Sequence, residues 1–302
     1  MRKNKGIYIG SRTSPKGSSR ACLCWDTNTY SISCCDGSIQ AQGIGSITGI
    51  APAPVNTPLT DATFYQAITD ILAEDPNGDY DLVPYGKIQD WDVSQVTDMS
   101  SAFDTNYPNF NGDISGWDVS SVSNMNNMFN GASAFNQPIG NWDVSSVTDM
   151  NFMFRRATNF NQDIGNWNVS SVSDLSYMFY LTEQFNQDLN SWDVSNVVNM
   201  SGTFGECVFN GDITDWDVSN VEVMEYMFRG AEPTVVVMQF NQDISNWDVS
   251  NVTSMRRMFE NAIAFNQDLS IWDVDNVSNC NAFSDDTPQW TLPKPNFTNC
   301  TP

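Results

Sequence analysis

Hydrophobic residues recur along this chain with a period of about 25 residues. The stretch "FNQDIGNWNVSSVSDLSYMF" (residues 160–179) has near copies in "FNQPIGNWDVSSVTDMNFMF" (135–154) and "FNQDISNWDVSNVTSMRRMF" (240–259). Successive tryptophans of the repeat are 26, 25, 25, 25, 24, 31 and 25 residues apart, and the insertion "EPTVVVM" (232–238) explains the long step. A fixed step in this range is typical of a stack of coils, in which each repeat buries its apolar face against its neighbours.

Each repeat has two halves that differ in the spacing of their apolar residues. In the first half, aromatic and β-branched residues alternate as Trp-x-Val, which predicts a short strand. In the second half, Val147, Met150 and Phe154 have helical spacing, and a preceding Ser and an early Asp suit the start of a helix. We therefore expect an α/β repeat protein, a solenoid of about eight coils that each contain a strand, a turn and a short helix.

One tryptophan occupies the same place in every repeat. The eight are Trp91, Trp117, Trp142, Trp167, Trp192, Trp216, Trp247 and Trp272. Their neighbours in the pattern are apolar at core spacing, so we expect them to be core residues rather than a platform for sugars.

An asparagine follows the first phenylalanine of each repeat. These residues are Asn111, Asn136, Asn161, Asn186, Asn210, Asn241 and Asn266. An amide carries both donors and an acceptor, so stacked amides can bond to one another and to turn backbone. Because buried polar groups need partners, we interpret this row as a structural ladder and not as a binding site.

An acidic residue follows each tryptophan, with one exception. The row is Asp92, Asp118, Asp143, Asn168, Asp193, Asp217, Asp248 and Asp273. Stacked coils would set these groups about 4.8 Å apart, so like charges there need nearby donors or cations. Asn168 shows that charge is not needed in every coil, which favours hydrogen bonds from the downstream Ser and turn N–H groups over a row of metal ions.

The unit "FNQDIGNWDVSSVTDMxxMFxxA" resembles the BspA-type, or mycoplasma-type, leucine-rich repeat of surface proteins, over residues 85–283. The segments "TFYQAITDIL" and "YGKIQDWDVSQVTDMSSAF" resemble the lead-in to such arrays, and "PQWTLPKPNFTNCTP" resembles their ending. The resemblance implies a curved leucine-rich-repeat solenoid that works by binding or display rather than catalysis. Such proteins occur among bacterial surface proteins and lipoproteins, and in marine microbes and their viruses.

The chain divides into segments of different composition. We expect a basic, Cys-rich attachment module (1–50), a Pro-rich linker "APAPVNTP" (51–58), an N-terminal cap (59–84), the solenoid (85–283) and a C-terminal cap or tail (284–302). The cap should contain a helix over residues 59–73, with Phe64, Ile68, Ile71 and Leu72 on its buried face. The leader also resembles short Cys-rich leaders on structural proteins of marine bacteriophages.

Charge is distributed very unevenly. Six of the 13 Lys and Arg lie in residues 1–20, which contain no acid, so the remaining residues hold 7 bases against 36 acids, a net charge of −29. Such a body repels nucleic acid and anionic envelopes. The sequence contains no run of about 18 apolar residues, so we expect no membrane-spanning segment. The basic N-terminal segment has neither the apolar core of a signal peptide nor a lipobox before Cys22.

The chain has seven cysteines and no histidine. The spacing of Cys22, Cys24, Cys34 and Cys35 suits two disulfides or a zinc site, and we favour disulfides because zinc sites more often use C-x2-C pairs. Cys280 and Cys300 flank the C-terminal end, and we expect them to form a disulfide that fastens the C-terminal cap. Cys207 remains, and we expect it to be a buried thiol in place of a small core residue.

Weak calcium candidates lie in "DPNGDYD", which sets Asp75, Asn77, Asp79 and Asp81 at alternate positions. The segment departs from the EF-hand pattern, because Tyr80 takes the place of the required Gly and Gly86 that of the final Glu. We expect a plain turn there, with no metal and no cofactor.

The sequence contains no catalytic constellation that we can identify. Without histidine, neither a Ser-His-Asp nor a Cys-His arrangement exists, and no phosphate-binding or dinucleotide fingerprint occurs. We predict a non-enzymatic structural and binding protein that is displayed on a virion, as a capsid decoration or as a tail or fibre protein. Residues 1–50 would attach it to other virion or surface proteins, and the solenoid would bind a host-surface ligand. The alternatives are a bacterial cell-surface adhesin and a carbohydrate-active enzyme, since paired acids abound.

Overall fold

The computed structural model describes residues 22–23, 30–31, 58–78, 81–82, 86–231 and 237–302. The chain forms two compact units, Met1–Pro54 and Val55–Pro302, and the boundary falls within the predicted linker. In the first unit, β1 (Cys22–Leu23) pairs antiparallel with β2 (Tyr30–Ser31). The predicted cysteine pairing or zinc site of this unit, with Cys24, Cys34 and Cys35, lies outside the described residues.

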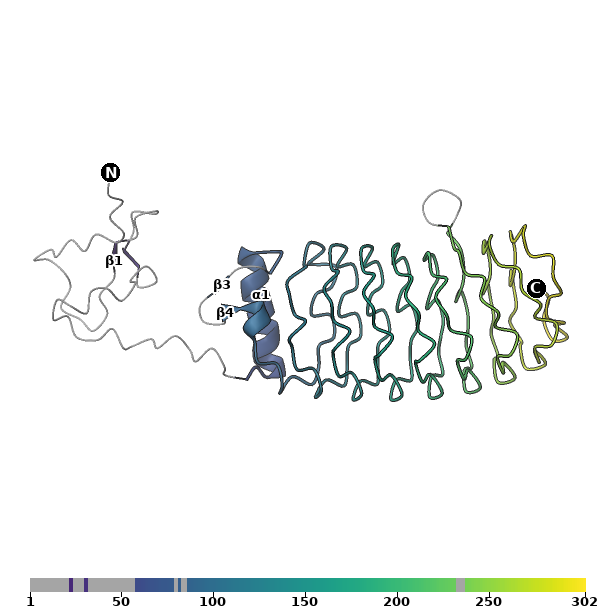
Figure 1. Ribbon diagram of the computed structural model, residues 1–302, viewed down its shortest axis with the longest axis horizontal. Coiled ribbons are helices and arrows are strands. Elements are labelled where there is room, and N and C mark those ends of the chain that lie inside the picture. Colours follow the sequence, from purple (N-terminus) through teal and green to yellow (C-terminus); the bar gives the residue numbers. More distant parts are fainter. Residues whose placement is uncertain (1–21, 24–29, 32–57, 79–80, 83–85, 232–236) are drawn as a thin grey trace, which may run out of the picture. The chain divides into compact units, whose positions relative to one another are not determined.

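The second unit begins with α1 (Asp61–Glu74), close to the helix predicted at residues 59–73 (Figure 1). At its start the N–H of Thr60 donates to Oγ1 of Thr63, which satisfies backbone that the helix leaves unpaired. Its buried face consists of Phe64, Ala67, Ile68, Ile71 and Leu72. Two short antiparallel strands, β3 (Asp81–Leu82) and β4 (Gly86–Lys87), and the 3₁₀ turn η2 (Ile88–Asp90) lead from the helix into the repeats.

The repeats lie side by side as coils, from α1 to the C-terminal end of this unit (Figure 1). We number them 1 to 8 by their tryptophans, Trp91 to Trp272. Seven residues after each tryptophan, one residue forms a parallel bridge to its counterpart in the next coil. The bridge residues are Asp98, Asn124, Asp149, Asp174, Asn199, Val223, Ser254 and Asn279. We call the stretch from each bridge residue through the eighth residue after it the ladder segment, for example residues 149–157 in coil 3.

Backbone N–H groups along a ladder segment alternate between two kinds of partner. The N–H groups of Phe152 and Arg156 donate to the carbonyls of Ser176 and Tyr180 in the next coil, at 2.9 and 2.8 Å. The N–H group of Arg155 instead turns back to the carbonyl of Phe152 in its own coil, at 3.1 Å. Each ladder segment is therefore a run of turns that is tied to the next coil at every second residue.

The short helix predicted for the second half of each repeat is wrong. After residue 90, the described chain contains no helix, and the Trp-x-Val stretch forms no strand, because the parallel bridge of each coil falls seven residues after its tryptophan. The third and seventh residues after the bridge adopt left-handed conformations, as Phe152 (φ 56°) and Arg156 (φ 59°) do in coil 3, and these interrupt any helix. The spacing of Met150, Met153 and Phe154 fits successive turns closed by bonds three residues apart as well as it fits a helix.

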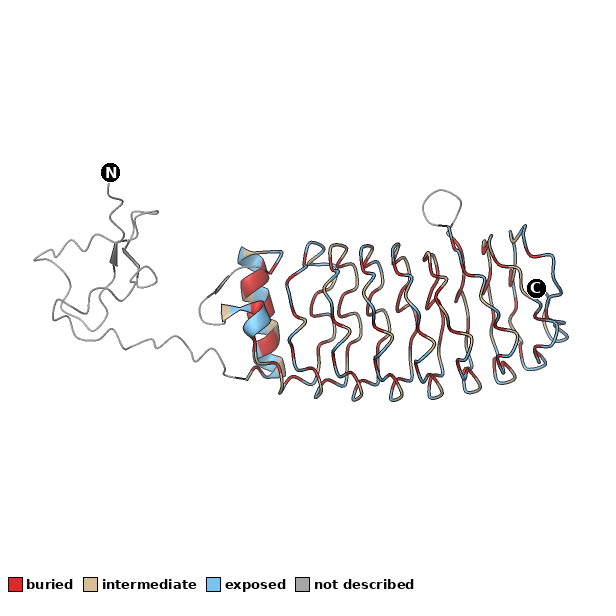
Figure 2. Ribbon diagram, viewed as in Figure 1, coloured by how far each residue is buried: buried red, intermediate tan, exposed pale blue. Residues whose placement is uncertain are grey.

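The core is made of aromatic columns that run through the stack, and Figure 2 shows that buried residues recur in every coil. The eight repeat tryptophans are all buried, and the rings of Trp142 and Trp167 stack 6.5 Å apart at an angle of 2°. Phenylalanines pair within a coil, as Phe129 and Phe135 do at 3.9 Å, and stack on the next pair at 5.4 to 6.0 Å. The core is therefore continuous from coil to coil.

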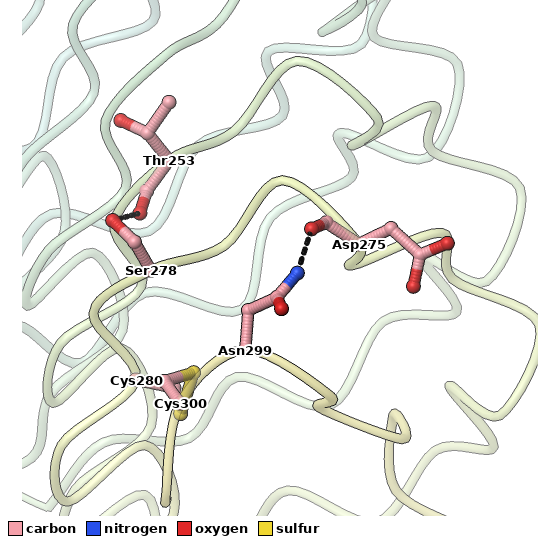
Figure 3. The surroundings of a disulfide bond; sticks show 6 residues. All are labelled: Thr253, Asp275, Ser278, Cys280, Asn299 and Cys300. Atoms are coloured by element: carbon pink, nitrogen blue, oxygen red, sulfur yellow. Dashed lines mark hydrogen bonds between the residues drawn. A yellow bond between two sulfur atoms is a disulfide. The ribbon is translucent and has the colours of Figure 1, made fainter.

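Both ends of the stack are covered. At the first coil, the carboxylate of Asp61 in α1 accepts bonds from the N–H and Oγ1 of Thr97 at 2.7 and 2.9 Å. At the last coil, a disulfide joins Cys280 to Cys300, and the amide of Asn299 donates to the carbonyl of Asp275 (Figure 3). Such covers hide the apolar core that an open end would expose.

Candidate binding surface

The asparagine row forms a ladder between coils. Oδ1 of Asn136 accepts the backbone N–H of Asn161 at 3.0 Å, and Oδ1 of Asn161 accepts that of Asn186 at 3.0 Å. The same bond links each of the seven asparagines to the next, and the last one to Thr291. Most of these asparagines are exposed, so the expectation that they are buried was wrong, although their bonds are those of a structural ladder.

A glutamine follows five of the seven asparagines and strengthens this ladder, and the sequence reasoning missed it. Nε2 of Gln162 donates to the carbonyl and to Oδ1 of Asn136, at 3.0 and 2.9 Å. The carbonyl of the preceding coil's asparagine also accepts a bond from Gln137, Gln187, Gln242 and Gln267. The recurring Asn-Gln pair could have indicated this role, because the glutamine side-chain amide can also bond to the backbone of the neighbouring coil.

The aspartates after the tryptophans bond within their own turns. Oδ1 of Asp143 accepts the N–H and Oγ of Ser145 at 3.1 and 2.6 Å, and Asn168 accepts the same two groups of Ser170. The bond from the Ser145 hydroxyl, followed by the bond from its N–H, lowers the pKa of Asp143, and the corresponding serines lower the pKa of Asp193 and Asp248. Serine donors thus relieve the negative charge of this row.

Of the four calcium candidates, Asp75 and Asn77 form an ordinary turn, and the side chain of Asp81 is not among those that the structure describes. Asp75 ends α1 through its N–H bond to Ile71, and its Oδ1 accepts the N–H of Asn77 at 3.2 Å, which is an Asx turn. Asp79 lies outside the described residues. No group of three or more Cys, Asp or Glu side chains with metal-binding geometry occurs in the described part of the chain, and no described helix is long and apolar enough to cross a membrane.

The repeats differ from one another mainly in the ladder segments. The first and fifth residues after the bridge are nearly constant and buried, with Met or Leu at the first and Phe at the fifth in coils 1 to 7. The second, third, sixth and seventh residues vary and most are only half-buried or exposed. We call the surface formed by these four positions the ladder face.

The non-core aromatic side chains of coils 2 to 7 gather on the ladder face. They are Phe152, Tyr177, Tyr180 and Tyr226, all half-buried. The rings of Phe152 and Tyr177 stack 5.1 Å apart at 4°, and a Cβ added to Gly202 in the next coil would lie 2.6 Å from the Tyr177 ring. Gly202 (φ 62°) therefore leaves room for Tyr177 to lie flat against coil 5.

All five arginines of residues 21–302 lie on the ladder face. They are Arg155 and Arg156 in coil 3, Arg229 in coil 6, and Arg256 and Arg257 in coil 7. Arg229 lies between Glu206, with which it is in close contact, and Glu260, 2.5 Å away. Tyr180 donates to Glu206 at 2.6 Å, and burial together with that carboxylate raises the pKa of Tyr180 to about 12.

The ladder face is hollowed at coils 6 to 8. The hollow has a volume of about 900 Å³ and combines charged with apolar groups, among them Arg257, Glu260, Val237 and Ile263. Val237 and Ile263 are 46% and 40% exposed, more than most large apolar side chains of this protein. This is a size that accommodates the side chains of a partner or a small ligand.

Cys207, the cysteine without a predicted partner, is completely buried at the eighth position of the ladder segment of coil 5, where coils 2 and 3 have alanine. Its Sγ donates to the carbonyl of Thr182, and burial raises the pKa of its thiol to about 12. A thiol so placed fills space in the core and is not a nucleophile.

The chain matches no curated protein and no solved structure. Three of its segments, residues 80–189, 156–236 and 235–295, match the family described as "Mycoplasma protein of unknown function, DUF285". Together these segments span more than half of the chain, and the chain belongs to this repeat family.

Proposed function

We propose that this member of the repeat family is a non-enzymatic structural and binding protein displayed on a surface. Its coils would form a leucine-rich-repeat-like solenoid, and the ladder face would be the surface that meets a partner. One observation carries the proposal: coils with a nearly constant core vary at outward positions of a single face, and the variable residues include the arginines of the coils and the non-core aromatics of coils 2 to 7. Tyr, Phe and Arg are the residue types enriched in the centres of protein interfaces.

We place the display on a virion, as a capsid decoration or as part of a tail or fibre, with residues 1–50 as the attachment module. The support is the contrast between a basic leader and a body of net charge −29, joined by a Pro-rich linker. A basic arm suits an acidic particle surface, while an acidic body avoids sticking to neighbouring subunits. The alternative location is a bacterial cell surface, where the protein would act as an adhesin.

The engagement of the carboxylates supports binding over carbohydrate cleavage. A glycosidase needs one carboxylic acid with a raised pKa beside a second carboxylate. The aspartates of the turns repeat from coil to coil and bond to serine, and Glu206 and Glu260 of the ladder face both bond to Arg229. Burial and then Asp174 raise the pKa of Asp149, but both carboxylates lie in the bridge row and accept backbone N–H groups, Asp149 from Asn151 at 2.9 Å and Asp174 from Ser176 at 2.7 Å.

Fractionation of a producing culture tests the proposal. The full chain and a variant lacking residues 1–50 are expressed with the same tag, and virus particles, cell envelopes and soluble protein are separated. We expect the full chain in the particle fraction and the truncated chain in the soluble fraction, with an unchanged melting temperature. Recovery in envelopes would favour the adhesin, and full-chain protein that stays soluble, or that cleaves a glycan in a hydrolysis panel, would overturn display.

A further inference from the structure

We propose that the ladder face of coils 3 to 7 binds an acidic segment of a partner protein, with the pairs Arg155–Arg156 and Arg256–Arg257 as the groups that hold its carboxylates. This inference rests on the proposed binding function and adds to it the contact residues and the chemistry of the partner.

Positive charge in the coils is confined to this one face. Arginine occurs there only at the four outward positions of the ladder segment, whereas aspartates recur in the turns before and after the tryptophans. The two lysines of the body, Lys87 and Lys294, lie outside the coils' ladder segments. A partner's carboxylates would therefore meet repulsion on most of a body with a charge of −29 and attraction on this face.

Aromatic rings of the face hold its arginines in place. The guanidinium of Arg155 lies 5.8 Å from the ring centroid of Phe152 and 6.0 Å from that of Tyr180. The guanidinium of Arg256 lies 5.3 Å from the ring of Tyr226 and contacts its hydroxyl. Cation–π contacts of this kind restrict the side chains before a ligand arrives, which lowers the entropic cost of binding.

The acids of the ladder face in coils 3 to 7 are already engaged by other side chains. Glu206 and Glu260 flank Arg229, and Glu225 accepts the hydroxyl of Ser254 at 2.6 Å. Arg229 is the arginine that these carboxylates neutralise most completely, since Arg257 reaches Glu260 only at 3.6 Å. The arginine pairs in coils 3 and 7 thus retain donors that can receive the carboxylates of a partner.

The aromatic residues favour a polypeptide over a sugar. Phe152 and Tyr177 cover each other's ring faces, and Tyr177 lies over Gly202, so the rings present edges to solvent instead of the open faces on which a pyranose stacks. Ring edges, guanidinium groups and a half-apolar hollow are typical of the centre of a protein interface.

The spacing of the arginine pairs sets the length of the segment. Four steps between coils of about 4.8 Å separate coil 3 from coil 7, roughly 20 Å in all. An extended polypeptide covers that distance with about six residues at 3.3 Å each. A long polyanion such as nucleic acid would extend past the face onto acidic turns, where it is repelled over a Debye length of about 8 Å.

The natural repeats provide substitutions that other coils already tolerate. Asn261 occupies in coil 7 the place of Arg156, and Ser201 occupies in coil 5 the place of Arg256. The double variant R156N/R256S should therefore keep the stack intact, and Asn suits the left-handed conformation at position 156 (φ 59°). The matched control K87S/K294S removes the same amount of charge outside the ladder face.

The experiment measures fluorescence anisotropy of a labelled oligoglutamate peptide of about ten residues, at about 0.15 M salt, where long-range repulsion is screened. We expect the full chain to bind it, R156N/R256S to bind about tenfold more weakly, and K87S/K294S to bind within about twofold of the parent. Circular dichroism and melting establish that both variants are folded.

Three results would overturn the proposal. The first is a parent chain that does not bind the peptide. The second is an equal loss of affinity in both double variants, which is a net-charge effect. The third is heparin or single-stranded DNA that binds more tightly than the peptide and is lost in R156N/R256S.

The peptide-binding experiment and the proposed display on a surface can fail independently, because display is tested by the fractionation of a producing culture. If the chain is found on particles but does not bind the peptide, the assignment of the ladder face is refuted. A soluble chain that binds the peptide refutes display alone.

Discussion

The indole Nε1 of Trp167 donates a hydrogen bond of 3.1 Å to the backbone carbonyl of Ile139 in the preceding coil. The same bond joins each later tryptophan to its predecessor's coil, as between Trp192 and Ile164 at 3.0 Å. Each tryptophan thus fills the core of its own coil and gives a buried carbonyl of the coil before it a second donor, a bond that a phenylalanine at this place could not make.

Replacing Trp167 separates these two roles. Trp167→Ala should cost about 3–5 kcal/mol of the free energy of unfolding, because a large buried aromatic is lost. Trp167→Phe retains much of the stacking but removes the indole donor, so the carbonyl of Ile139 keeps only its bond from the N–H of Trp142 at 3.1 Å, and the variant should cost about 1–2 kcal/mol. Denaturant unfolding measures both. A Trp167→Phe variant that is as stable as the parent would mean that the hydrogen bond contributes nothing.

The amide ladder should make a smaller contribution at each coil. Asn161→Ala removes the acceptor for Asn186 and Gln187, and because these groups are exposed to water we expect a loss of about 1 kcal/mol. The control is Asn159→Ala in the same coil, an exposed residue outside the ladder, which should change stability by less than about 0.5 kcal/mol. A loss of the same size in both variants would show that the ladder does not stabilise the stack.

Stability should fall in acid. Serine bonds hold the pKa of Asp143, Asp193 and Asp248 below the ordinary value of 3.8, so these carboxylates stabilise the fold above that value and cease to do so as the pH falls through their folded-state pKa. Asp149, whose pKa is raised by burial, acts in the opposite direction.

Melting temperatures between pH 7 and pH 2 test this prediction, and the decline should begin below about pH 4. The variant D143N/D193N, which copies the natural Asn168, should melt near the parent at pH 7 and decline less steeply in acid. If the melting temperature of D143N/D193N fell with pH as steeply as that of the parent, these aspartates would not be the cause of the loss of stability in acid.

The C-terminal disulfide should stabilise the tail that covers coil 8. Cys280 and Cys300 are 20 residues apart, and closing a loop of this length contributes about 3 kcal/mol. The variant C280A/C300A should therefore melt lower and release residues 284–302 to limited proteolysis. Cys207→Ala, which restores the alanine found in coils 2 and 3, is the control and should leave the tail protected. A protected tail in both variants would mean that the contacts of Phe283 and Trp290 suffice without the bond.

The helices and core residues that were predicted correctly from the sequence are those that depend on side-chain burial alone. The helix α1 and its buried Phe64 follow from an apolar face of ordinary helical spacing. The helix expected in each ladder segment failed because left-handed backbone at residues such as Phe152 is costly in isolation and is stabilised only by bonds to the next coil. Such bonds connect residues far apart in the chain, and no local pattern reports them.

The ladder face was missed for a different reason. The sequence analysis was based on the positions that are constant in the repeat, and it drew nothing from the positions that vary. A usable signal did exist, because every arginine after residue 20 falls at one of four places in the repeat, as with Arg155 and Arg256. Recognising those four places as one surface required the bridge register, which brings Phe152 beside Tyr177.

Hydrogen exchange of the ladder amides tests the central claim most directly, because the ladder face exists only if the segments are paired as described. In coils 3 and 4, the N–H groups of Phe152, Phe154 and Tyr177 donate to the following coil. We predict that these amides exchange slowly and together, with an opening free energy close to that of global unfolding. Fast exchange of these amides in a chain that is otherwise protected would contradict the paired ladder and the binding surface built on it.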